Sequence, residues 1–352
     1  MSYLDNSKTQ IVAKDLAYPE SPAYCSDDSI LLVEIRGERL TRVHPDGSTE
    51  KVASIPGGPN GLAMAPTGSN GEQYAYICNC GGFEWFSYPP GSDHPTLWIG
   101  GNQPANYTGG KIEKVNLGSG EVTELFGEYE IPPAALKAHG LSECKPPYKL
   151  RGPDDGVVDS AGGMWISDFG KQRPFERDIT SVYYMAPGET SLKQVFYPLN
   201  SPNGIALSPD EKWLYIALSY ERRVIKYEIA PGGTFKPNPK TTDGSYLVTG
   251  EFIGSSVLDS MRVDSEGNLY VVTMLPEGFD PNLNGGITVV SPEGDVLDFI
   301  EIKSPDGAIA PMPSSLCFGG TDLKTAYITC GGSGYLLSMP SRIAGLKPNF
   351  SC

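Results

Sequence analysis

The chain lacks the features that most common classes of binding protein need. Its 352 residues include 27 Lys and Arg against 42 Asp and Glu, a formal net charge of −15. No basic stripe offsets this acidic surplus, so the composition argues against nucleic acid and anionic membranes as partners and favours cation binding. The chain has no apolar run of the roughly 18 residues that a membrane span needs, and residues 1–8 lack the apolar core of a secretory signal. We therefore expect a soluble, cytoplasmic protein.

Cysteine and histidine are also scarce. Seven Cys is an odd count, and their spacing is not that of a secreted disulfide framework, so we expect reduced thiols. Cys78 and Cys80 form one close pair, but zinc would need two further ligands, and the three His lie elsewhere. A Gly-x-Ser-x-Gly elbow is absent, which gives a serine hydrolase little support.

The chain does contain a repeat. Six segments share one pattern, in which a polar residue is followed by a short apolar run, a turn, and a strand centred eleven to sixteen residues on. From leading residue to mid-strand, the six are Glu20 to Leu32, Asn60 to Tyr76, Asp154 to Trp165, Asn203 to Tyr215, Asp259 to Tyr270 and Ser315 to Tyr327. Strands of period two that recur about every 50 residues predict propeller blades, because four short antiparallel strands use up that length.

We therefore predict an all-β fold, a six-bladed β-propeller of four-stranded antiparallel blades that forms one domain over residues 1–352. The last blade runs out of chain after its third strand, so residues 10–17 should supply its outer strand and close the ring. One strand spacing is much longer than the others, and part of the excess is a proline-containing insertion at residues 127–149. Loops of that length are usually functional, so we expect the insertion to cover the channel mouth.

The first strand of each propeller blade lines the central channel. The six leading residues should therefore form one polar ring that contains three carboxylates and two asparagines. Hard cations such as calcium prefer such oxygen ligands. Taken singly, Asp and Asn at strand starts more often cap turns. Four such residues at equivalent positions, Glu20, Asp154, Asn203 and Asp259, favour a cation site instead.

Seven short motifs, in order, resemble the regucalcin and gluconolactonase family of six-bladed propellers. They are Gly58-Pro-Asn-Gly-Leu-Ala, Cys78-Asn-Cys-Gly-Gly-Phe, Leu150-Arg-Gly-Pro-Asp-Asp, Gly162-Gly-Met-Trp-Ile-Ser-Asp-Phe-Gly-Lys, Ser201-Pro-Asn-Gly-Ile, Asp259-Ser-Met-Arg-Val-Asp and Cys317-Phe-Gly-Gly-Thr-Asp-Leu. The resemblance implies one divalent cation, most often Ca²⁺, with Zn²⁺, Mg²⁺ or Mn²⁺ as alternatives, and hydrolysis of lactones or related esters. It also implies that Glu20, Asn203 and Asp259 bind the metal and that Asp259 is the base.

The chain departs from the family pattern on this ring. Asp154 and Ser315 stand where relatives often have Asn, and Cys80 follows Asn79 where many have a second Asn. These changes suggest an altered small-molecule substrate, contacted by Asn60, Asn79, Cys80 and Ser315, with Trp85 as an apolar wall. Asp154 is a fourth candidate metal ligand and the rival base.

Two other function classes stay open. A propeller used only for binding would need no acidic ring. The same metal scaffold could instead hydrolyse phosphotriesters or catalyse a non-hydrolytic cyclisation or isomerisation. The sequence carries no signal for an oligomeric state.

Overall fold

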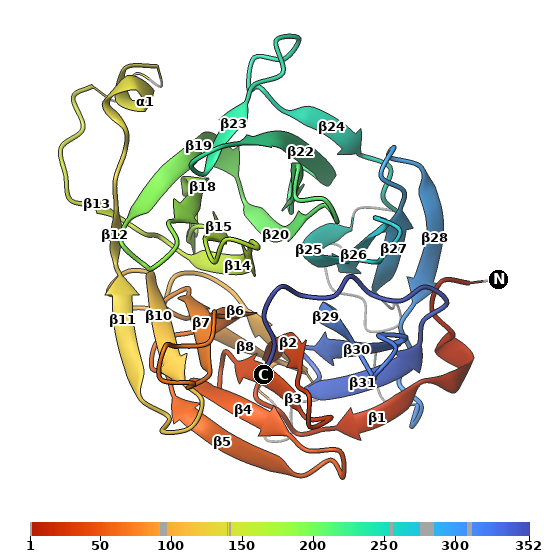
Figure 1. The fold of residues 1–352 in the computed structure, drawn as a ribbon. Coiled ribbons are helices and arrows are strands. Elements are labelled where there is room, and N and C mark those ends of the chain that lie inside the picture. The colour runs from red at the N-terminus through yellow and green to blue at the C-terminus, as the bar shows by residue number, and fades with distance from the viewer. Residues whose placement is uncertain are drawn as a thin grey trace.

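A computed structural model of the chain describes residues 2–91, 97–138, 140, 142–253, 256–274, 285–307 and 312–352. Its strands form six antiparallel sheets arranged as blades around a central channel, which confirms the predicted six-bladed β-propeller (Figure 1). The first three blades consist of β2 (Pro19–Tyr24), β3 (Ile30–Glu34), β4 (Arg39–Val43) and β5 (Thr49–Ser54); β6 (Pro59–Met64), β7 (Tyr74–Asn79), β10 (Lys111–Asn116) and β11 (Val122–Phe126); and β14 (Pro153–Val158), β15 (Met164–Asp168), β18 (Ile179–Met185) and β19 (Leu192–Asn200).

The other three blades consist of β20 (Pro202–Leu207), β21 (Trp213–Leu218) and β22 (Arg223–Ala230), with both β23 (Thr234–Lys236) and β24 (Tyr246–Thr249) on β22; β25 (Val257–Val263), β26 (Leu269–Met274), β27 (Gly286–Val290) and β28 (Val296–Glu301); and β29 (Pro313–Gly319), β30 (Thr325–Cys330), β31 (Tyr335–Pro340) and β1 (Gln10–Ala13). β1 is the outer strand of the last blade, where Gln10 pairs with Ser338 and Ile11 with Leu337. The predicted closure of the ring by the N-terminal segment is therefore confirmed.

The hydrophobic core lies between blades. In the described part of the chain, the buried apolar side chains form six clusters, one at each junction of neighbouring blades. β3 shows how period two produces this arrangement: Leu31 and Val33 pack toward the second blade, whereas Leu32 packs toward the last blade. Each blade is buried on both faces, and the channel-facing strand starts are left for polar residues.

Three hairpins and two short helices extend the blades. They are β8 (Trp85–Tyr88) with β9 (Leu97–Gly100), β12 (Glu128–Tyr129) with β13 (Tyr148–Lys149), β16 (Gln172–Arg173) with β17 (Glu176–Arg177), α1 (Pro133–Ala138), and the 3₁₀-helix Asn6–Lys8. No helix of the described residues is long and apolar enough to cross a membrane.

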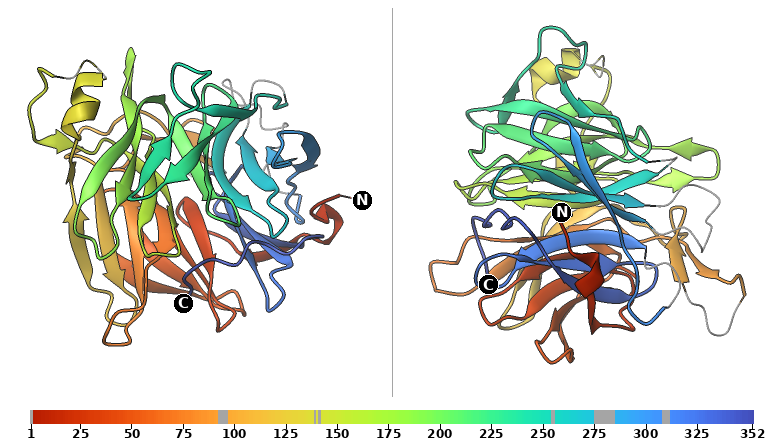
Figure 2. Two further views of the ribbon diagram at one scale, coloured as in Figure 1. Left: turned by 45° about the horizontal axis from the view of Figure 1, so that its top comes forward. Right: turned by 90° about the vertical axis from the view of Figure 1, so that its right-hand side faces the viewer.

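The insertion at residues 127–149 does not lie where we predicted. β12 and β13 pair with each other, and Glu130 bonds to the backbone of β19, the outermost strand of its blade. Figure 1 places α1 and β13 at the outer edge of the propeller, away from the channel. The lid prediction is therefore wrong for the described residues of this segment. The hairpin β8–β9 lies instead on the propeller face opposite the C-terminus (Figure 2).

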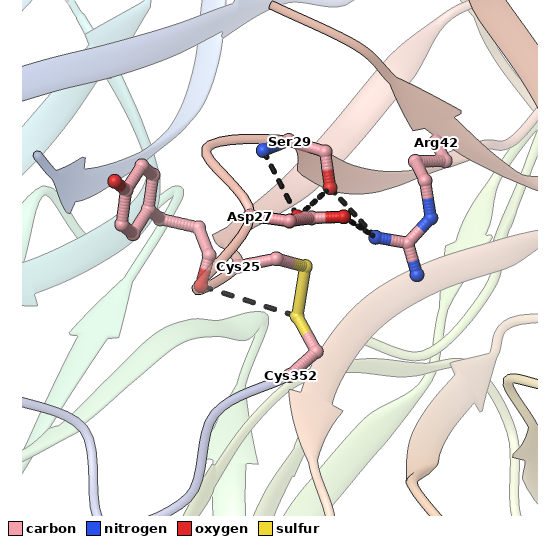
Figure 3. The surroundings of a disulfide bond; sticks show 6 residues. Cys25, Asp27, Ser29, Arg42 and Cys352 are labelled. Carbon is pink, nitrogen blue, oxygen red and sulfur yellow. Dashed lines mark hydrogen bonds and ion pairs between the residues drawn. A yellow bond between two sulfur atoms is a disulfide. The ribbon is translucent and has the colours of Figure 1, made fainter.

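The C-terminal segment, residues 341–352, crosses the other face toward the channel axis (Figures 1 and 2). Its backbone bonds to Val263, and the side chain of Asn349 bonds to the carbonyl oxygen of Val158. It ends in a disulfide between Cys352 and Cys25, 327 residues apart (Figure 3). The expectation of reduced thiols is therefore wrong for these two residues. The other five cysteines are free.

Candidate metal centre and substrate site

A ring of polar side chains surrounds one end of the channel. In five of the six first strands, the ring residue follows the residue that opens the strand ladder, as in the pairs Pro19↔Glu34 and Pro153↔Asp168. In β25 it follows the second pair, Leu258↔Thr273. A register shift lies at or directly after the ring residue in every case. The bulge leaves five of the ring residues without a partner in the ladder, whereas Glu20 pairs with Val33. The ring residues given by this register are Glu20, Asn60, Asp154, Asn203, Asp259 and Ser314.

The last member differs from the prediction by one residue. Pro313 pairs with Cys330, so Ser314 holds the ring position, whereas the predicted Ser315 pairs with Thr329. The side-chain hydroxyl of Ser314 also hydrogen-bonds the Glu20 carboxylate, as a ring member should. The sequence contained this signal, because a proline precedes the ring residue in five of the six blades.

Three carboxylates of the ring are held by neighbouring polar groups. The Nδ2 of Asn60 donates to Oδ2 of Asp154 at 2.8 Å. Glu20 accepts a hydrogen bond from the backbone nitrogen of Ser21 at 2.8 Å, and Asp259 accepts one from the Asn203 side chain. Glu20 and Asp154 are buried, and Asp259 is half-buried. The ring therefore presents preoriented oxygen atoms at one end of the channel.

Burial and mutual repulsion shift the pKa values of these carboxyls upward. Desolvation raises the pKa of Asp259 to about 7, and its hydrogen bond from Asn203 opposes the shift. Desolvation, followed by the charge of Asp259, also raises the pKa of Glu20 and of Asp154 well above their usual range. Within the described residues, no Lys, Arg or His nitrogen lies within 4.0 Å of these carboxylates. A nearby cation would remove the cost of charging them.

The donor set fits a hard cation. Oδ1 of Asn203 is buried and has no hydrogen-bond partner among the described residues, so an amide oxygen remains available beside two carboxylates. No group of three His, Cys, Asp or Glu side chains in the described ranges is placed to hold a metal ion. The set Glu20, Asn203 and Asp259 contains two carboxylates and one amide, so that finding does not apply to it, and the three remain a possible ligand set.

Two further residues of the channel were missed by the sequence reasoning. Asp155 follows the ring residue Asp154, and its Oδ2 accepts a hydrogen bond from Nη1 of Arg262 at 2.9 Å. This ion pair joins β14 to β25, two channel-lining strands. Arg262 also lines a cavity of about 660 Å³ at the opposite end of the channel, which Ile205, Phe318 and Phe350 line as well. The sequence did point to Asp155, within Pro153-Asp-Asp, but gave no sign that a partner lies 107 residues away.

The predicted substrate-contacting residues of the second blade have different surroundings. Nδ2 of Asn79 donates to Oε2 of Glu113 and to the carbonyl oxygen of Pro56, and its Oδ1 accepts from Gly81. Its amide is thus bonded within the protein, which is a structural role. Cys80 is buried and close enough to Asp154 to raise the pKa of that carboxyl. The ring of Trp85 on β8 lies 4.9 Å from that of Tyr18 at a tilted angle, and burial, followed by the ring carboxylates, raises the pKa of Tyr18. Trp85 therefore lies near the ring, as expected of a wall.

Lys171 is a cation near the ring end of the channel. Its side chain is buried, and its ammonium lies 4.4 Å from the centre of the Phe83 ring. It is close enough to Asp154 to lower the pKa of that carboxyl. Gly152 cannot carry a larger side chain here, because a Cβ would come within 2.7 Å of the carbonyl oxygen of Gly170.

Residues 18–332 match the family described as SMP-30/Gluconolactonase/LRE-like region. The chain belongs to this family. Among curated proteins, a lactonase, drp35, of Staphylococcus saprophyticus is 30% identical over 196 residues, which are 46% of this chain and 57% of that protein. The drp35 lactonase of Staphylococcus aureus strain MW2 is 29% identical over 192 residues, 46% of this chain and 56% of that protein. The chain thus matches a little over half the length of these relatives.

Solved structures share the fold at low identity. A gluconolactonase of Xanthomonas campestris has a TM-score of 0.64 at 19% identity, covering 95% of this chain and 89% of that one. A calcium-binding regucalcin of Agrobacterium tumefaciens strain C58 has a TM-score of 0.62 at 14% identity, covering 95% and 93%. These likenesses confirm the predicted fold, and the match over residues 18–332 confirms the predicted family.

Proposed function

We propose that the protein hydrolyses a lactone or a related ester at the ring end of the channel. The observation that carries this proposal is the free, buried Oδ1 of Asn203 beside the carboxylates of Glu20 and Asp259. Oxygen donors that lack a cationic partner in the protein are the ligands that a hard divalent cation prefers. The names of the relatives, lactonase and gluconolactonase, support this reaction class, and the calcium-binding regucalcin favours calcium.

In this proposal Glu20, Asn203 and Asp259 hold the cation, and Asp154 lies outside the ligand set, oriented by Asn60. When bound, the divalent cation supplies an electrophile that polarises the ester carbonyl. A carboxylate of the ring takes a proton from the attacking water. The acyl carbon–oxygen bond then breaks, and the leaving alkoxide takes up a proton to give a hydroxy acid. Asp259 is our choice of base, and Asp154 is the alternative.

The test is metal analysis of the purified protein, followed by a panel of lactones and esters with and without a chelator. We expect about one bound divalent cation per chain and hydrolysis that stops on chelation and returns with Ca²⁺, Zn²⁺, Mg²⁺ or Mn²⁺. Glu20→Gln and Asp259→Asn should lose activity. The control is Asp264→Asn, because Asp264 is a buried carboxylate whose turn-capping bonds an amide oxygen can still accept. Activity that survives chelation, or an unaffected Glu20→Gln enzyme, would overturn the proposal.

A further inference from the structure

The ammonium of Lys171 is buried without a carboxylate partner. The residue is 1% exposed, and Nζ donates one hydrogen bond, to the carbonyl oxygen of Gly82 at 2.7 Å. Its other neighbours are the ring faces of Phe83 at 4.4 Å and Tyr107 at 5.5 Å. No carboxylate oxygen of the described residues lies within 4.0 Å of it. Two of its three N–H donors therefore have no oxygen acceptor from the described residues.

Burying the charge of Lys171 has a cost, which its contacts offset. Removing an ammonium from water costs several kcal/mol even after the protein relaxes. Cation–π contacts are worth about 0.5–2 kcal/mol, and a hydrogen bond to a charged donor about 1.5–3 kcal/mol. These contacts are of the same order as the cost, and a further oxygen acceptor for the two remaining N–H donors would stabilise the ammonium more.

The backbone around Lys171 holds the ammonium in place. Its N–H donates to Oδ2 of Asp178 at 3.0 Å, and its carbonyl oxygen accepts from the Asp178 N–H at 3.1 Å. The buried carboxylate of Asp168 accepts hydrogen bonds from the backbone nitrogens of Arg151, Gly152 and Gly170, and Gly170 directly precedes Lys171. The turn that carries the side chain is thus fixed on both sides. Such preorganisation is typical of a binding residue.

A role as simple counterion to Asp154 does not account for this arrangement. The two residues are close enough to interact through their charges, yet they do not pair directly, and Oδ2 of Asp154 accepts instead from Asn60. The ammonium lies among aromatic side chains and near the ring residue Asp154. An incoming anionic oxygen would meet both free donors there.

We propose that Lys171 binds an anionic substituent of the substrate, so that the preferred substrates are lactones or esters that carry a carboxylate. The choice of lactones rests on the proposed function, but the anion site does not. An anionic group would otherwise be repelled by the three ring carboxylates and by the net charge of −15. Lys171 is thus a specificity-determining residue.

The test compares γ-butyrolactone with its carboxylated analogue, 5-oxotetrahydrofuran-2-carboxylate. The first measurement is the dissociation constant of each compound on chelator-treated protein, by NMR titration. The second is kcat/KM for each compound on the metal-loaded protein. In Lys171→Met, binding of the carboxylated compound should weaken about 10- to 100-fold, the equivalent of a charge-assisted hydrogen bond. Binding of the neutral lactone should stay within about twofold of wild type.

Lys226→Met is the matched control. Lys226 also donates to a backbone carbonyl, that of Pro292, and lies over two aromatic rings, Trp213 and Tyr215, but on an outer part of its blade. This variant should behave as wild type toward both compounds. Lys171→Arg keeps the charge and should keep the preference for the carboxylated compound.

Three results would overturn the proposal. The wild-type protein could bind the two compounds with equal affinity, or the Lys171→Met variant could lose affinity for both compounds equally. The third is that Lys171→Met binds both compounds as tightly as the wild type. If Lys171→Met does not fold, the wild-type comparison alone decides. Hydrolysis without any preference for the carboxylate would refute the anion site and leave the proposed function standing. Lys171-dependent binding of the carboxylated compound without hydrolysis of any ester would refute the proposed function and leave the anion site standing.

Discussion

Calcium affinity should depend steeply on pH, because protons compete with the cation for the ring carboxylates. Burial raises the pKa of Asp259 to about 7 in the metal-free protein. One such group is about 90% protonated at pH 6 and about 10% protonated at pH 8, so it alone should weaken apparent Ca²⁺ binding about tenfold between pH 8 and pH 6. The pKa of Glu20 is also raised well above its usual range, which makes the expected dependence steeper.

Isothermal titration calorimetry at pH 6, 7 and 8 and constant ionic strength measures this dependence. Repeating each titration in two buffers with different ionisation enthalpies gives the number of protons released. We expect about half a proton per Ca²⁺ from Asp259 near pH 7, and the raised pKa of Glu20 should add to this number. Asp259→Asn should bind more weakly at pH 8 and depend less on pH, and Asp264→Asn should follow the wild type.

Equal affinity at pH 6 and pH 8, with no proton release, would show that Asp259 does not compete for the cation and would refute the reasoning. The raised pKa of Asp259 also makes the free energy of unfolding depend on pH. Since the folded metal-free state binds a proton that an unfolded Asp releases near its usual pKa, unfolding free energy should fall as the pH rises through the range up to about 7. Saturating Ca²⁺ should remove this loss.

Three further outcomes are expected. Asp154→Asn should weaken Ca²⁺ binding roughly 3- to 30-fold in calorimetry, because it removes a negative charge near the cation but leaves the three ligands in place. Asp259→Ala should lower kcat about 10²- to 10⁴-fold and leave the far-ultraviolet circular dichroism spectrum unchanged. Near-normal turnover in Asp259→Ala would transfer the base role to Asp154. Cys352→Ser should lower the unfolding free energy, measured in urea, by about 2–4 kcal/mol, and the loop-closure entropy sets an upper limit of about 6 kcal/mol. The control, Cys144→Ser, changes an exposed free thiol and should have no effect. Equal stabilities of the two variants would show that the disulfide does not constrain the unfolded chain. Replacing residues 131–147 by a two-residue turn between β12 and β13 should leave the substrate panel unchanged, because the segment lies at the edge of the propeller, and a changed panel would restore the lid.

The sequence predicted the blades because each repeat encodes its own strands. Period-two burial in β3 and the polar residue at each strand start depend on neighbours in the same blade. Closure by β1 also followed, since a propeller blade that lacks an outer strand has one nearby segment to supply it. The family resemblance then added the roles of Glu20, Asn203 and Asp259, which the repeat alone does not assign.

What the sequence missed depends on contacts between distant blades or on a one-residue register. Ser314 and Ser315 are adjacent and chemically alike, so only the strand ladder distinguishes them. Cys25 and Cys352 meet because the closed ring brings the two ends of the chain together, and no local spacing announces that. Arg262 and Asp155 belong to different blades in the same way. The insertion packs on β19 through backbone bonds, which composition does not encode.

The Arg262–Asp155 ion pair and the C-terminal segment both lie on the side of the ring opposite the hairpin β8–β9. The ion pair links two lining strands below the ring, and the C-terminal segment, fastened to Cys25, spans the far opening. If a hydroxy acid is formed at the ring, we expect it to leave past the hairpin β8–β9, along the route by which the ester arrived. Product and substrate would then occupy the same passage in turn, and accumulated product should slow turnover by simple competition for entry.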